Sequence, residues 1–426
     1  MKVLIVGGGG REHAIATKIA ENPTVEKLYA APGNGGMASI CELVPLKATD
    51  VEGIVAWAKD NAIDFVVVAP DDPLCLGMVD ALKAVDIPAF GPEKNAAVIE
   101  GSKVFSKNLM KKYGIPTAAY ETFDDYDAAV AYLENAAYPI VVKADGLALG
   151  KGVLICPDKA SAVEAVGSMM KEARFGASGA RVVIEEFLTG PEVSVLAFTD
   201  GKVVKPMVSS MDHKRAGDHD TGLNTGGMGT IAPNPYYTPE IAERCMREIF
   251  LPTIAAMNAE GRSFKGCLYF GLMLTPNGPK VIEYNCRFGD PETQVVLPLL
   301  KSDLLTIMQA CENGTLAETE VEFSTGAACC VIIASGGYPE KYEKGKTISL
   351  NGAEDAENVR VFHSGTALKD GALVTNGGRV LGVTATADTL KQAIADAYTA
   401  ARKIHFDGMF MRSDIGARAM QALNEE

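Results

Sequence analysis

The first hundred residues alternate between short apolar runs and segments whose apolar positions have helical spacing. "KVLIVGGGGREHAIATKIAE", residues 2–21, has the pattern of a strand, a glycine turn and an amphipathic helix. Further strands are expected within residues 27–34, 64–72 and 87–92, and helices at 51–60 and 73–84. Alternating β and α segments form parallel sheets with helices on both faces. We therefore predict a doubly wound parallel sheet that ends near residue 101.

Beyond residue 101 the regular alternation stops. "GSKVFSKNLMKKYGIPTA" predicts a basic helix that ends at its Gly-Ile-Pro sequence. Residues 119–188 have the pattern of two strand pairs around a glycine loop, and residues 190–325 are mixed. "FSTGAACCVIIASGGYP" opens a last α+β region, which includes a strand at 379–387 and a helix at 388–404. Four structural units are therefore expected.

One predicted strand near residue 285 carries an unusual set of polar side chains. "KVIEYN" follows "YFGLMLT" and "PNGP", which predicts a hairpin with Asn277-Gly278 as its turn. Strand alternation then assigns Val281, Glu283, Asn285 and Arg287 to one face and Ile282, Tyr284 and Cys286 to the other.

The polar face of this strand leads into a turn with Asp290 and Glu292. Carboxylate and amide oxygens two residues apart are ligands that Mg²⁺ takes, and an arginine beside them can bind a carboxylate or phosphate. The alternative is an edge strand whose outer face is merely solvated.

Composition narrows the class of protein. The 426 residues suit two to four domains. The 40 Lys and Arg against 54 Asp and Glu give a net charge of −14, which argues against a general nucleic-acid or membrane surface. The nine cysteines form no CxxC pair, which is typical of reduced thiols. No run of eighteen apolar residues occurs and the start has no cleavage signal, so we expect a soluble, cytoplasmic protein.

The glycine turn after the first strand resembles a dinucleotide-binding fingerprint only in part. Glu12 or His13 occupies the position where close helix packing needs a small residue, and the second strand ends in "AAPGN" without an acidic residue. NAD is therefore disfavoured. Bare amides at a helix N-terminus still suit a phosphate, which Arg11 and His13 could assist. The alternative is a simple tight turn.

Two further segments are compatible with nucleotide binding. "VVKADGLALGKG", residues 141–152, places a lysine on a strand before a glycine loop with a second lysine, but its spacing is not that of a P-loop. Such a loop can close over phosphates, or it is a solvated hairpin. "VIEEFLTGPE", residues 183–192, offers backbone groups for an adenine edge and Glu192 for a ribose. Read alone, it is a strand that ends in an acidic turn.

A long polar segment, "SSMDHKRAGDHDTGLNTGGMGTIAPNP" at residues 209–235, is the remaining candidate. Long loops in compact proteins are usually functional or disordered. Asp212, His213 and His219 raise the question of zinc, but a third well-spaced His or Cys is missing, so zinc is disfavoured.

Taken together, these segments resemble the phosphoribosylamine–glycine ligase family of ATP-grasp enzymes. The resemblance covers essentially the whole chain and rests on motifs that occur in the family's order: "GGGGREHA", "EGSKVFSKNLM", "IVVKADGLALGKG", "VIEEFLTG", "DHKRAGDHDTGLNTGGMG", "GLMLTPNGPKVIEYNCRFGDPETQ" and "VFHSGTALKDGALVTNGGRVL". It implies an ATP-grasp fold with an N-terminal Rossmann-like domain, a lid, a central domain and a C-terminal α+β domain. The implied boundaries are 1–101, 119–189 for the lid, 102–118 with 190–325 for the central domain, and 326–426.

The resemblance also implies an activity. Glycine would be joined to 5-phospho-β-D-ribosylamine with ATP as co-substrate and Mg²⁺ or Mn²⁺ as the metal, through a glycyl phosphate, in purine biosynthesis. The partners would be these small molecules alone, with neither nucleic acid nor membrane, and the protein would be a monomer.

Site residues follow from the same motifs. The implied catalytic residues are Arg287, Lys143, Asp212 and Lys214, and the implied metal ligands are Glu283 and Asn285. The implied ATP-binding residues are Lys103, Lys143, Gly150, Lys151, Gly152, Glu185, Glu186, Phe187, Leu188 and Glu192. The implied substrate-binding residues are Gly8, Gly9, Gly10, Arg11, His13, Asp71, Arg287, Asp290 and Glu292.

Two positions depart from the family pattern, and the motifs leave two rival functions. Asp71, in "APDDPL", is one methylene shorter than the usual acidic residue, and Leu149 replaces a small residue of the lid loop. Another ATP-grasp ligase of purine metabolism is the nearest rival, but "GDPETQ" and "TNGGRVL" favour the glycine enzyme. The retained lysines and metal ligands argue against a catalytically inactive nucleotide sensor.

Overall fold

The computed structural model describes residues 1–147, 152–172 and 175–424. Its N-terminal part is a five-stranded parallel sheet in the order β3-β2-β1-β4-β5. The strands are β1 Lys2–Gly7, β2 Lys27–Pro32, β3 Glu42–Leu43, β4 Phe65–Val68 and β5 Ala89–Phe90. The helices are α1 Gly10–Ile19, α2 Val51–Asp60, α3 Asp71–Cys75, α4 Met78–Lys83 and α5 Lys94–Gly101. The predicted doubly wound sheet is confirmed.

The helix predicted at 73–84 is wrong as a single element. The chain forms α3 and α4 instead, and Gly77 separates them with a φ of 89°. A positive φ interrupts helical hydrogen bonding, and glycine adopts it without a steric penalty.

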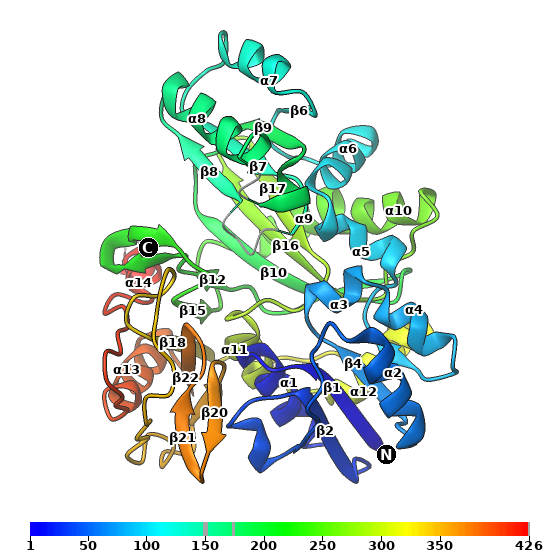
Figure 1. The fold of residues 1–426 in the computed structure, drawn as a ribbon, viewed down its shortest axis with the longest axis vertical. Coiled ribbons are helices and arrows are strands. Elements are labelled where there is room, and N and C mark those ends of the chain that lie inside the picture. The colour runs from blue at the N-terminus through cyan, green and yellow to red at the C-terminus, as the bar shows by residue number, and fades with distance from the viewer. Residues whose placement is uncertain (148–151, 173–174, 425–426) are drawn as a thin grey trace.

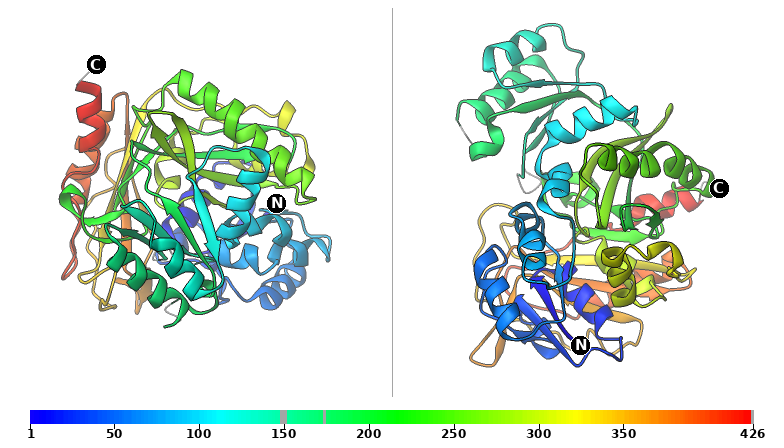
Figure 2. Two further views of the ribbon diagram at one scale, coloured as in Figure 1. Left: turned by 90° about the horizontal axis from the view of Figure 1, so that it is seen from above. Right: turned by 90° about the vertical axis from the view of Figure 1, so that its right-hand side faces the viewer.

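The lid region is an antiparallel sheet in the order β6-β9-β7-β8, at the top of Figure 1. Its strands are β6 Tyr120–Phe123, β7 Ile140–Ala144, β8 Val153–Cys156 and β9 Val182–Glu186. Helices α7 Tyr126–Leu133 and α8 Lys159–Met170 cover one face and share a small apolar core with it. Figure 2 shows this region projecting away from the N-terminal sheet.

The central sheet has the order β11-β10-β16-β17 and is also antiparallel. Its strands are β10 Glu192–Thr199, β11 Val204–Pro206, β16 Gly266–Thr275 and β17 Gly278–Asn285. Around it lie α6 Lys103–Tyr113, α9 Pro239–Cys245, a π-helical turn Met246–Phe250 and α10 Leu251–Ala259. The predicted hairpin is confirmed, but Thr275 pairs with Gly278, so its two-residue turn is Pro276-Asn277 rather than Asn277-Gly278.

The face assignment on β17 was wrong at its first residue. Gly271 pairs with Glu283 and Leu272 with Val281, so Ile282 is the extra residue of a β-bulge. The bulge shifts the alternation by one position. Val281 therefore packs in the same core as Tyr284 and Cys286, whereas Glu283, Asn285 and Arg287 remain outside it, at the site.

The last sheet joins strands from two parts of the chain in the order β12-β15-β18-β22-β19. Its members are β12 Met211–Asp212, β15 Gly229–Ala232, β18 Ala327–Ala334, β19 Val359–His363 and β22 Arg379–Ala387. The predicted strand at 379–387 and helix near 388–404 are confirmed as β22 and as α13 Leu390–Ala401. A ribbon of β20 Thr366–Lys369 and β21 Ala372–Thr375 lies beside them, at the bottom of Figure 1. The polar segment at 209–235 is thus anchored in this sheet at both ends.

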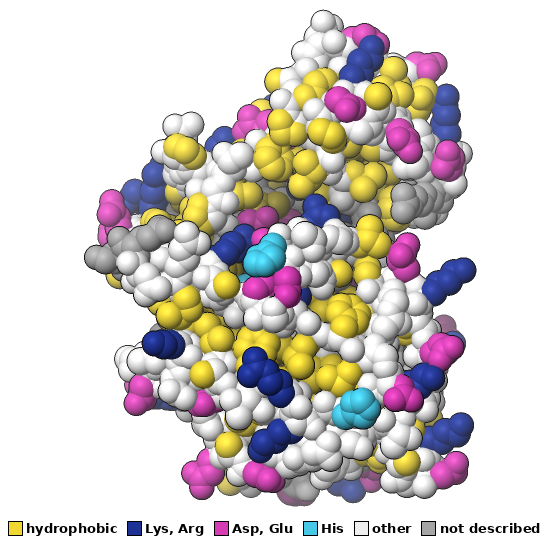
Figure 3. Space-filling view, turned by 90° about the vertical axis from the view of Figure 1, so that its left-hand side faces the viewer, with side chains coloured by type: hydrophobic (Ala, Val, Ile, Leu, Met, Phe, Trp, Pro, Cys, Tyr) yellow, Lys and Arg dark blue, Asp and Glu magenta, His cyan; other side chains and the backbone are white. Residues whose placement is uncertain are grey.

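Surface charge, helix length and cysteine environment are three further properties of the fold. On the face in Figure 3, acidic and basic side chains are interspersed without a broad patch of one sign. Within the described ranges, none of the helices combines the length and apolar character needed to cross a bilayer. All nine cysteines are free thiols, and only Cys75 is not fully buried.

Candidate active site

Glu283 on β17 is surrounded by basic side chains from three different parts of the chain. The Nζ atom of Lys214 lies 4.0 Å from its Oε1. Burial works to raise the pKa of the Glu283 carboxyl, but Lys214, Lys143 and Lys103 outweigh it and hold that pKa below its usual value. Glu283 is therefore a stable anion facing a group of cations, which suits a centre that binds both phosphate and a divalent ion.

Asn285 lies two residues further along the same face, and its amide is fixed. Its Nδ2 atom donates to Glu100 Oε1 at 3.0 Å and to Tyr284 O at 3.0 Å. Since the amide is planar, its Oδ1 atom is directed away from Glu100. The carboxylate of Glu283 and the amide oxygen of Asn285 form an all-oxygen donor pair, which fits Mg²⁺ or Mn²⁺ completed by phosphate oxygens and water.

Arg287 continues this face and is held by two carboxylates. Its NH2 atom lies 3.0 Å from Glu100 Oε1 and 3.8 Å from Asp71 Oδ2. Burial opposes the charge, but Glu100 and Asp71 outweigh it, so the pKa of Arg287 is raised. Its Nε atom is buried without a hydrogen-bond partner among the described residues. A buried, unpaired donor on a fixed cation is suited to an anionic ligand.

The lysines predicted to contact ATP face this centre from α6 and the lid. Lys143 on β7 lies 2.5 Å from Glu185 Oε1 and donates to Ile282 O at 3.2 Å. Lys103, at the first turn of α6, donates to Gly146 O at 2.7 Å. One of these lysines therefore comes from α6 and the other from the lid, and both act electrostatically on Glu283.

Glu185 does not point toward an open binding surface. It is buried between Lys143 and Lys107, whose Nζ atom lies 2.6 Å from Glu185 Oε2. Burial lowers the pKa of Lys107 to about 8 despite the opposing charge of Glu185. Sequence reasoning missed Lys107, although its spacing of four residues from Lys103 places both on one face of a helix.

The rest of the predicted adenine segment is more exposed. Glu186 pairs with Lys280 at 3.1 Å, and Phe187 keeps 38% of its surface exposed. Leu188 is half-buried and follows β9. Glu192, at the start of β10, lies 3.1 Å from Lys214, which therefore bridges it to Glu283.

The glycine loop of the lid is only partly described. Gly152 is buried and its carbonyl accepts a hydrogen bond from Ala144 N at 2.8 Å. The predicted positions Leu149, Gly150 and Lys151 lie outside the described residues.

Asp212 and Glu292 form an acidic pair, and Lys214 interacts electrostatically with both. Burial, and then the charge of Glu292, raise the pKa of Asp212 well above its usual value. The pKa of Glu292 is also raised, chiefly by burial. Glu292 is buried and Asp212 half-buried, and two interacting carboxyls of this kind favour sharing a proton or binding a cation.

The N-terminal glycine turn packs directly against the segment after β17. The Arg11 amide donates to Asp290 Oδ2 at 3.1 Å, and its guanidinium donates to Phe288 O at 3.0 Å. Gly9 N donates to Glu12 Oε2 at 2.7 Å, so part of this helix N-terminus is already satisfied by its own side chains. A side chain at Gly8 would place its Cβ 2.4 Å from Gly33 O, which explains the glycine there.

Two histidines near the site have structural partners. His13 is buried and its Nδ1 atom accepts from His363 N at 2.8 Å, while burial lowers the pKa of His13 to about 3. It is therefore neutral at physiological pH. His213 bonds Gly229 O at 3.0 Å through Nδ1 and accepts from Gly416 N at 3.1 Å through Nε2. Both of its ring nitrogens are thus engaged with backbone groups, and within the described ranges no three His, Cys, Asp or Glu side chains gather as a metal site.

Three known domain families match successive parts of the chain. Residues 1–100, 101–293 and 328–418 match the N domain, the ATP-grasp (A) domain and the C domain of phosphoribosylglycinamide synthetase. The chain belongs to the phosphoribosylglycinamide synthetase family. The resemblance drawn from the sequence motifs and the ATP-grasp fold class are confirmed.

Relatives in this family match over their whole length. The phosphoribosylamine–glycine ligases of Brucella melitensis and Vibrio cholerae are 50% and 48% identical, and each alignment covers 99% of both chains. The solved phosphoribosylamine–glycine ligase of Thermotoga maritima is 36% identical, with a TM-score of 0.86 over 97% of this chain and 100% of that one.

A more distant neighbour shows the fold alone. The biotin carboxylase domain of Hydrogenobacter thermophilus 2-oxoglutarate carboxylase, solved with MgADP, is 17% identical, with a TM-score of 0.74 over 96% of this chain and 91% of that one.

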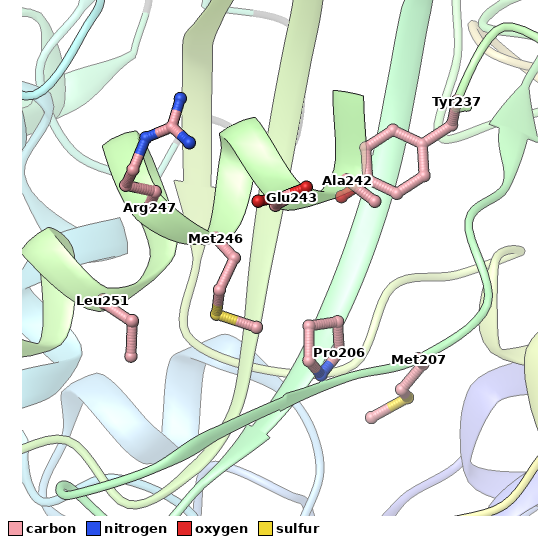
Figure 4. Close-up of a pocket in the computed structure, with 8 residues that line it drawn as sticks. All are labelled: Pro206, Met207, Tyr237, Ala242, Glu243, Met246, Arg247 and Leu251. Carbon is pink, nitrogen blue, oxygen red and sulfur yellow. The ribbon is translucent and has the colours of Figure 1, made fainter. Parts of the chain in front are cut away.

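A separate apolar hollow lies away from these charged groups. It has a volume of about 570 Å³ and is lined by Pro206, Tyr237, Met246, Arg247 and Leu251, as Figure 4 shows. None of the family-implied site residues lines it. Its charged lining is Glu243 and Arg247, which are opposite in sign, rather than the several cations that gather around Glu283, so we place the chemistry at Glu283.

Proposed function

We propose that the chain catalyses the ATP-dependent ligation of glycine to 5-phospho-β-D-ribosylamine, which yields glycinamide ribonucleotide, ADP and phosphate in purine biosynthesis. Full-length similarity to phosphoribosylamine–glycine ligases supports this activity. The observation that carries the residue-level proposal is that Glu283, two residues before Asn285 on the same strand, interacts with lysines from the lid and from the 209–235 segment.

The reaction needs no nucleophile from the protein. An oxygen of the glycine carboxylate attacks the γ-phosphorus of ATP and releases ADP, which gives glycyl phosphate. The amine of phosphoribosylamine then attacks the carbonyl carbon, loses a proton and expels phosphate. Catalysis is then positioning and charge neutralisation by fixed groups.

We assign the nucleotide to the lid side of the site. Lys103 and Lys143 neutralise phosphate oxygens, and Gly150, Lys151 and Gly152 belong to the loop above them. The segment of Glu185, Glu186, Phe187 and Leu188 borders the adenine, and Glu192 holds the ribose. The ion pair of Lys107 with Glu185 supports this assignment, because it keeps the Glu185 carboxylate charge-balanced when Lys143 turns to phosphate.

We assign the metal to Glu283 and Asn285, with Mg²⁺ as the proposed ion. When bound, the ion supplies neutralisation of the charge on the transferring phosphoryl group. The protein holds its donor oxygens on one strand face, with their orientation fixed by neighbours.

We assign glycine to the space between Arg287 and the acidic pair. The free Nε atom of Arg287 suits the carboxylate or the acyl phosphate. Asp212 and Glu292 suit the ammonium group, since two interacting carboxyls with raised pKa values gain by taking up a cation. Lys214 pairs with Glu192 and supplies a positive charge beside the Glu283 carboxylate.

We assign the sugar phosphate to the N-terminal side of the site. The turn of Gly8, Gly9 and Gly10 with Arg11 faces this region, with His13 as a neutral support beneath it. Asp71 and Asp290 border it, and their ion pairs with Arg287 and Arg379 supply fixed charges. We also propose a monomeric, cytoplasmic enzyme with the domain boundaries 1–101, 102–118 with 190–325, 119–189 and 326–426.

Phosphate release measures this activity directly. With ATP, Mg²⁺, glycine and freshly prepared phosphoribosylamine, we expect steady release that stops when either acceptor substrate is omitted. Equal release with another amino acid, or with another amine in place of phosphoribosylamine, would contradict the substrate assignment.

A further inference from the structure

Glu100 is the first residue of "EGSKVFSKNLM", and it is a buried carboxylate to which the sequence resemblance assigns no role. It lies near the end of α5 with 7% of its surface exposed, and α5 contacts β17 of the central sheet (Figure 1). The helix belongs to the N-terminal part of the chain, whereas the strand carries the metal ligands. Glu100 therefore connects two units that are far apart in sequence.

The carboxylate of Glu100 accepts from three successive residues of the site. Oε1 accepts from Asn285 Nδ2 at 3.0 Å and lies 3.0 Å from Arg287 NH2. Oε2 accepts from Cys286 N at 2.7 Å. An anchor of the strand alone would need only the backbone bond. The two side-chain contacts set the direction in which Asn285 and Arg287 present their remaining atoms.

The orientation of the Asn285 amide is the decisive point. Its two N–H bonds have acceptors in Glu100 and in the carbonyl of Tyr284, and a carboxylate accepts but does not donate. A flipped amide would place Oδ1 against the Glu100 carboxylate, two acceptors facing each other. Glu100 thus excludes the orientation in which Asn285 would offer a metal ion an NH₂ group.

We propose that Glu100 is a positioning residue that fixes Asn285 with its oxygen toward the metal ion and holds Arg287 at the anion site. The proposal rests on the proposed metal assignment. Partners of metal ligands commonly change metal affinity by ten- to a hundredfold when they are altered.

The test replaces Glu100 and measures metal binding rather than turnover. Mn²⁺ is titrated into the ADP-saturated protein and followed by electron paramagnetic resonance, with ADP and Mn²⁺ alone as the blank. In Glu100→Gln, one end of the side chain becomes an NH₂ group that faces a donor, so we expect Mn²⁺ affinity to fall about tenfold. ADP affinity without metal should stay within about twofold.

A matched control separates this effect from the loss of any buried carboxylate. Asp200 is 3% exposed and accepts from the amides of Lys202 at 2.9 Å, Val203 at 3.0 Å and Leu316 at 3.2 Å, away from the metal ligands. Asp200→Asn should lower the melting temperature and leave Mn²⁺ affinity unchanged. If Glu100→Gln does not fold, Glu100→Asp replaces it, since the shorter arm keeps the charge and withdraws the acceptor.

A double-mutant cycle gives the sharper outcome. If Glu100 acts through Asn285, the variant with both Glu100→Gln and Asn285→Ala binds Mn²⁺ no more weakly than Asn285→Ala alone. The positioning role would be overturned if the two substitutions lowered Mn²⁺ affinity independently, so that their effects multiplied in the double variant. It would also be overturned if Asn285→Ala weakened Mn²⁺ binding while Glu100→Gln left it unchanged. An unchanged affinity in Asn285→Ala itself would overturn the metal assignment instead.

Discussion

At the residue scale, the charge of Glu283 is the property on which ligand binding at this centre depends most. Lys103, Lys143 and Lys214 keep this carboxylate ionised although burial opposes the charge. We expect Glu283→Gln to lose on the order of a hundredfold or more in rate, because it removes a charged metal ligand. Phosphate release at limiting Mg²⁺ measures this, with the exposed Glu121→Gln as the control. Near-normal turnover at limiting Mg²⁺ would refute the assignment.

Cys286 and Arg287 are neighbours with opposite environments. Cys286 is fully buried, and burial raises the pKa of its thiol well above the usual value, so it is not a thiolate nucleophile. We expect Cys286→Ser to keep most of the rate. Arg287→Ala removes the cation that pairs with Glu100 and Asp71 and should cost roughly 2 to 5 kcal/mol in transition-state stabilisation.

Steady-state kinetics of both variants test this contrast, together with mass spectrometry of the protein after turnover. A glycyl adduct on Cys286 would contradict this account and show covalent catalysis by the thiol. An inactive Cys286→Ser variant beside an active Arg287→Ala variant would point to the same conclusion.

At the scale of elements, the turn between β9 and β10 joins the lid to the central sheet. Gly190 has a φ of 143°, and a Cβ there would lie 2.1 Å from Leu274 O in the β16–β17 hairpin. Gly190→Ala should therefore lower the melting temperature more than Gly261→Ala, where φ is 69° but the space is open. Equal losses in thermal unfolding would mean that the contact with the hairpin does not hold the turn.

The elements also show what the sequence could and could not predict. Regular alternation was enough for the parallel sheet, and the polar face of β17 was found from its period. The bulge at Ile282 was not, because it depends on how β17 pairs with β16. The face of Val281 was therefore assigned wrongly, although Glu283 and Asn285 were not affected.

Long-range partners were beyond a reading of local patterns. Glu100 lies 185 residues before Asn285, and its role depends on how α5 packs against β17. The pairing of β15 with β18 likewise joins segments almost a hundred residues apart. Such contacts follow from tertiary packing, so motifs identified the family but did not identify these partners.

At the scale of the whole molecule, histidines buried at contacts between parts of the chain make stability depend on pH. Burial lowers the pKa of His13 to about 3 and those of His213 and His363 to about 4, from a usual value near 6.5. The unfolded chain thus binds more protons below pH 6.5, so their contribution to stability is complete above 6.5 and is lost toward pH 4.

We expect the free energy of unfolding to fall as the pH is lowered from 7 to 5. The slope of this free energy against pH reports how many more protons the unfolded chain binds, and His363→Asn should reduce that number by up to one. Denaturant unfolding at several pH values measures it, with the exposed His405→Gln as the control. A slope that is the same in the His363 variant as in the unaltered protein would contradict this origin of the pH dependence.

The central claim is that glycine is activated by transfer of a phosphoryl group to its own carboxylate at the Glu283 centre. Turnover with glycine labelled with ¹⁸O in both carboxylate oxygens tests it, with mass spectrometry of the released phosphate. We predict that one ¹⁸O atom enters each phosphate, because the oxygen that attacks ATP leaves with phosphate when the amine forms the amide. Unlabelled phosphate beside labelled product would contradict the account.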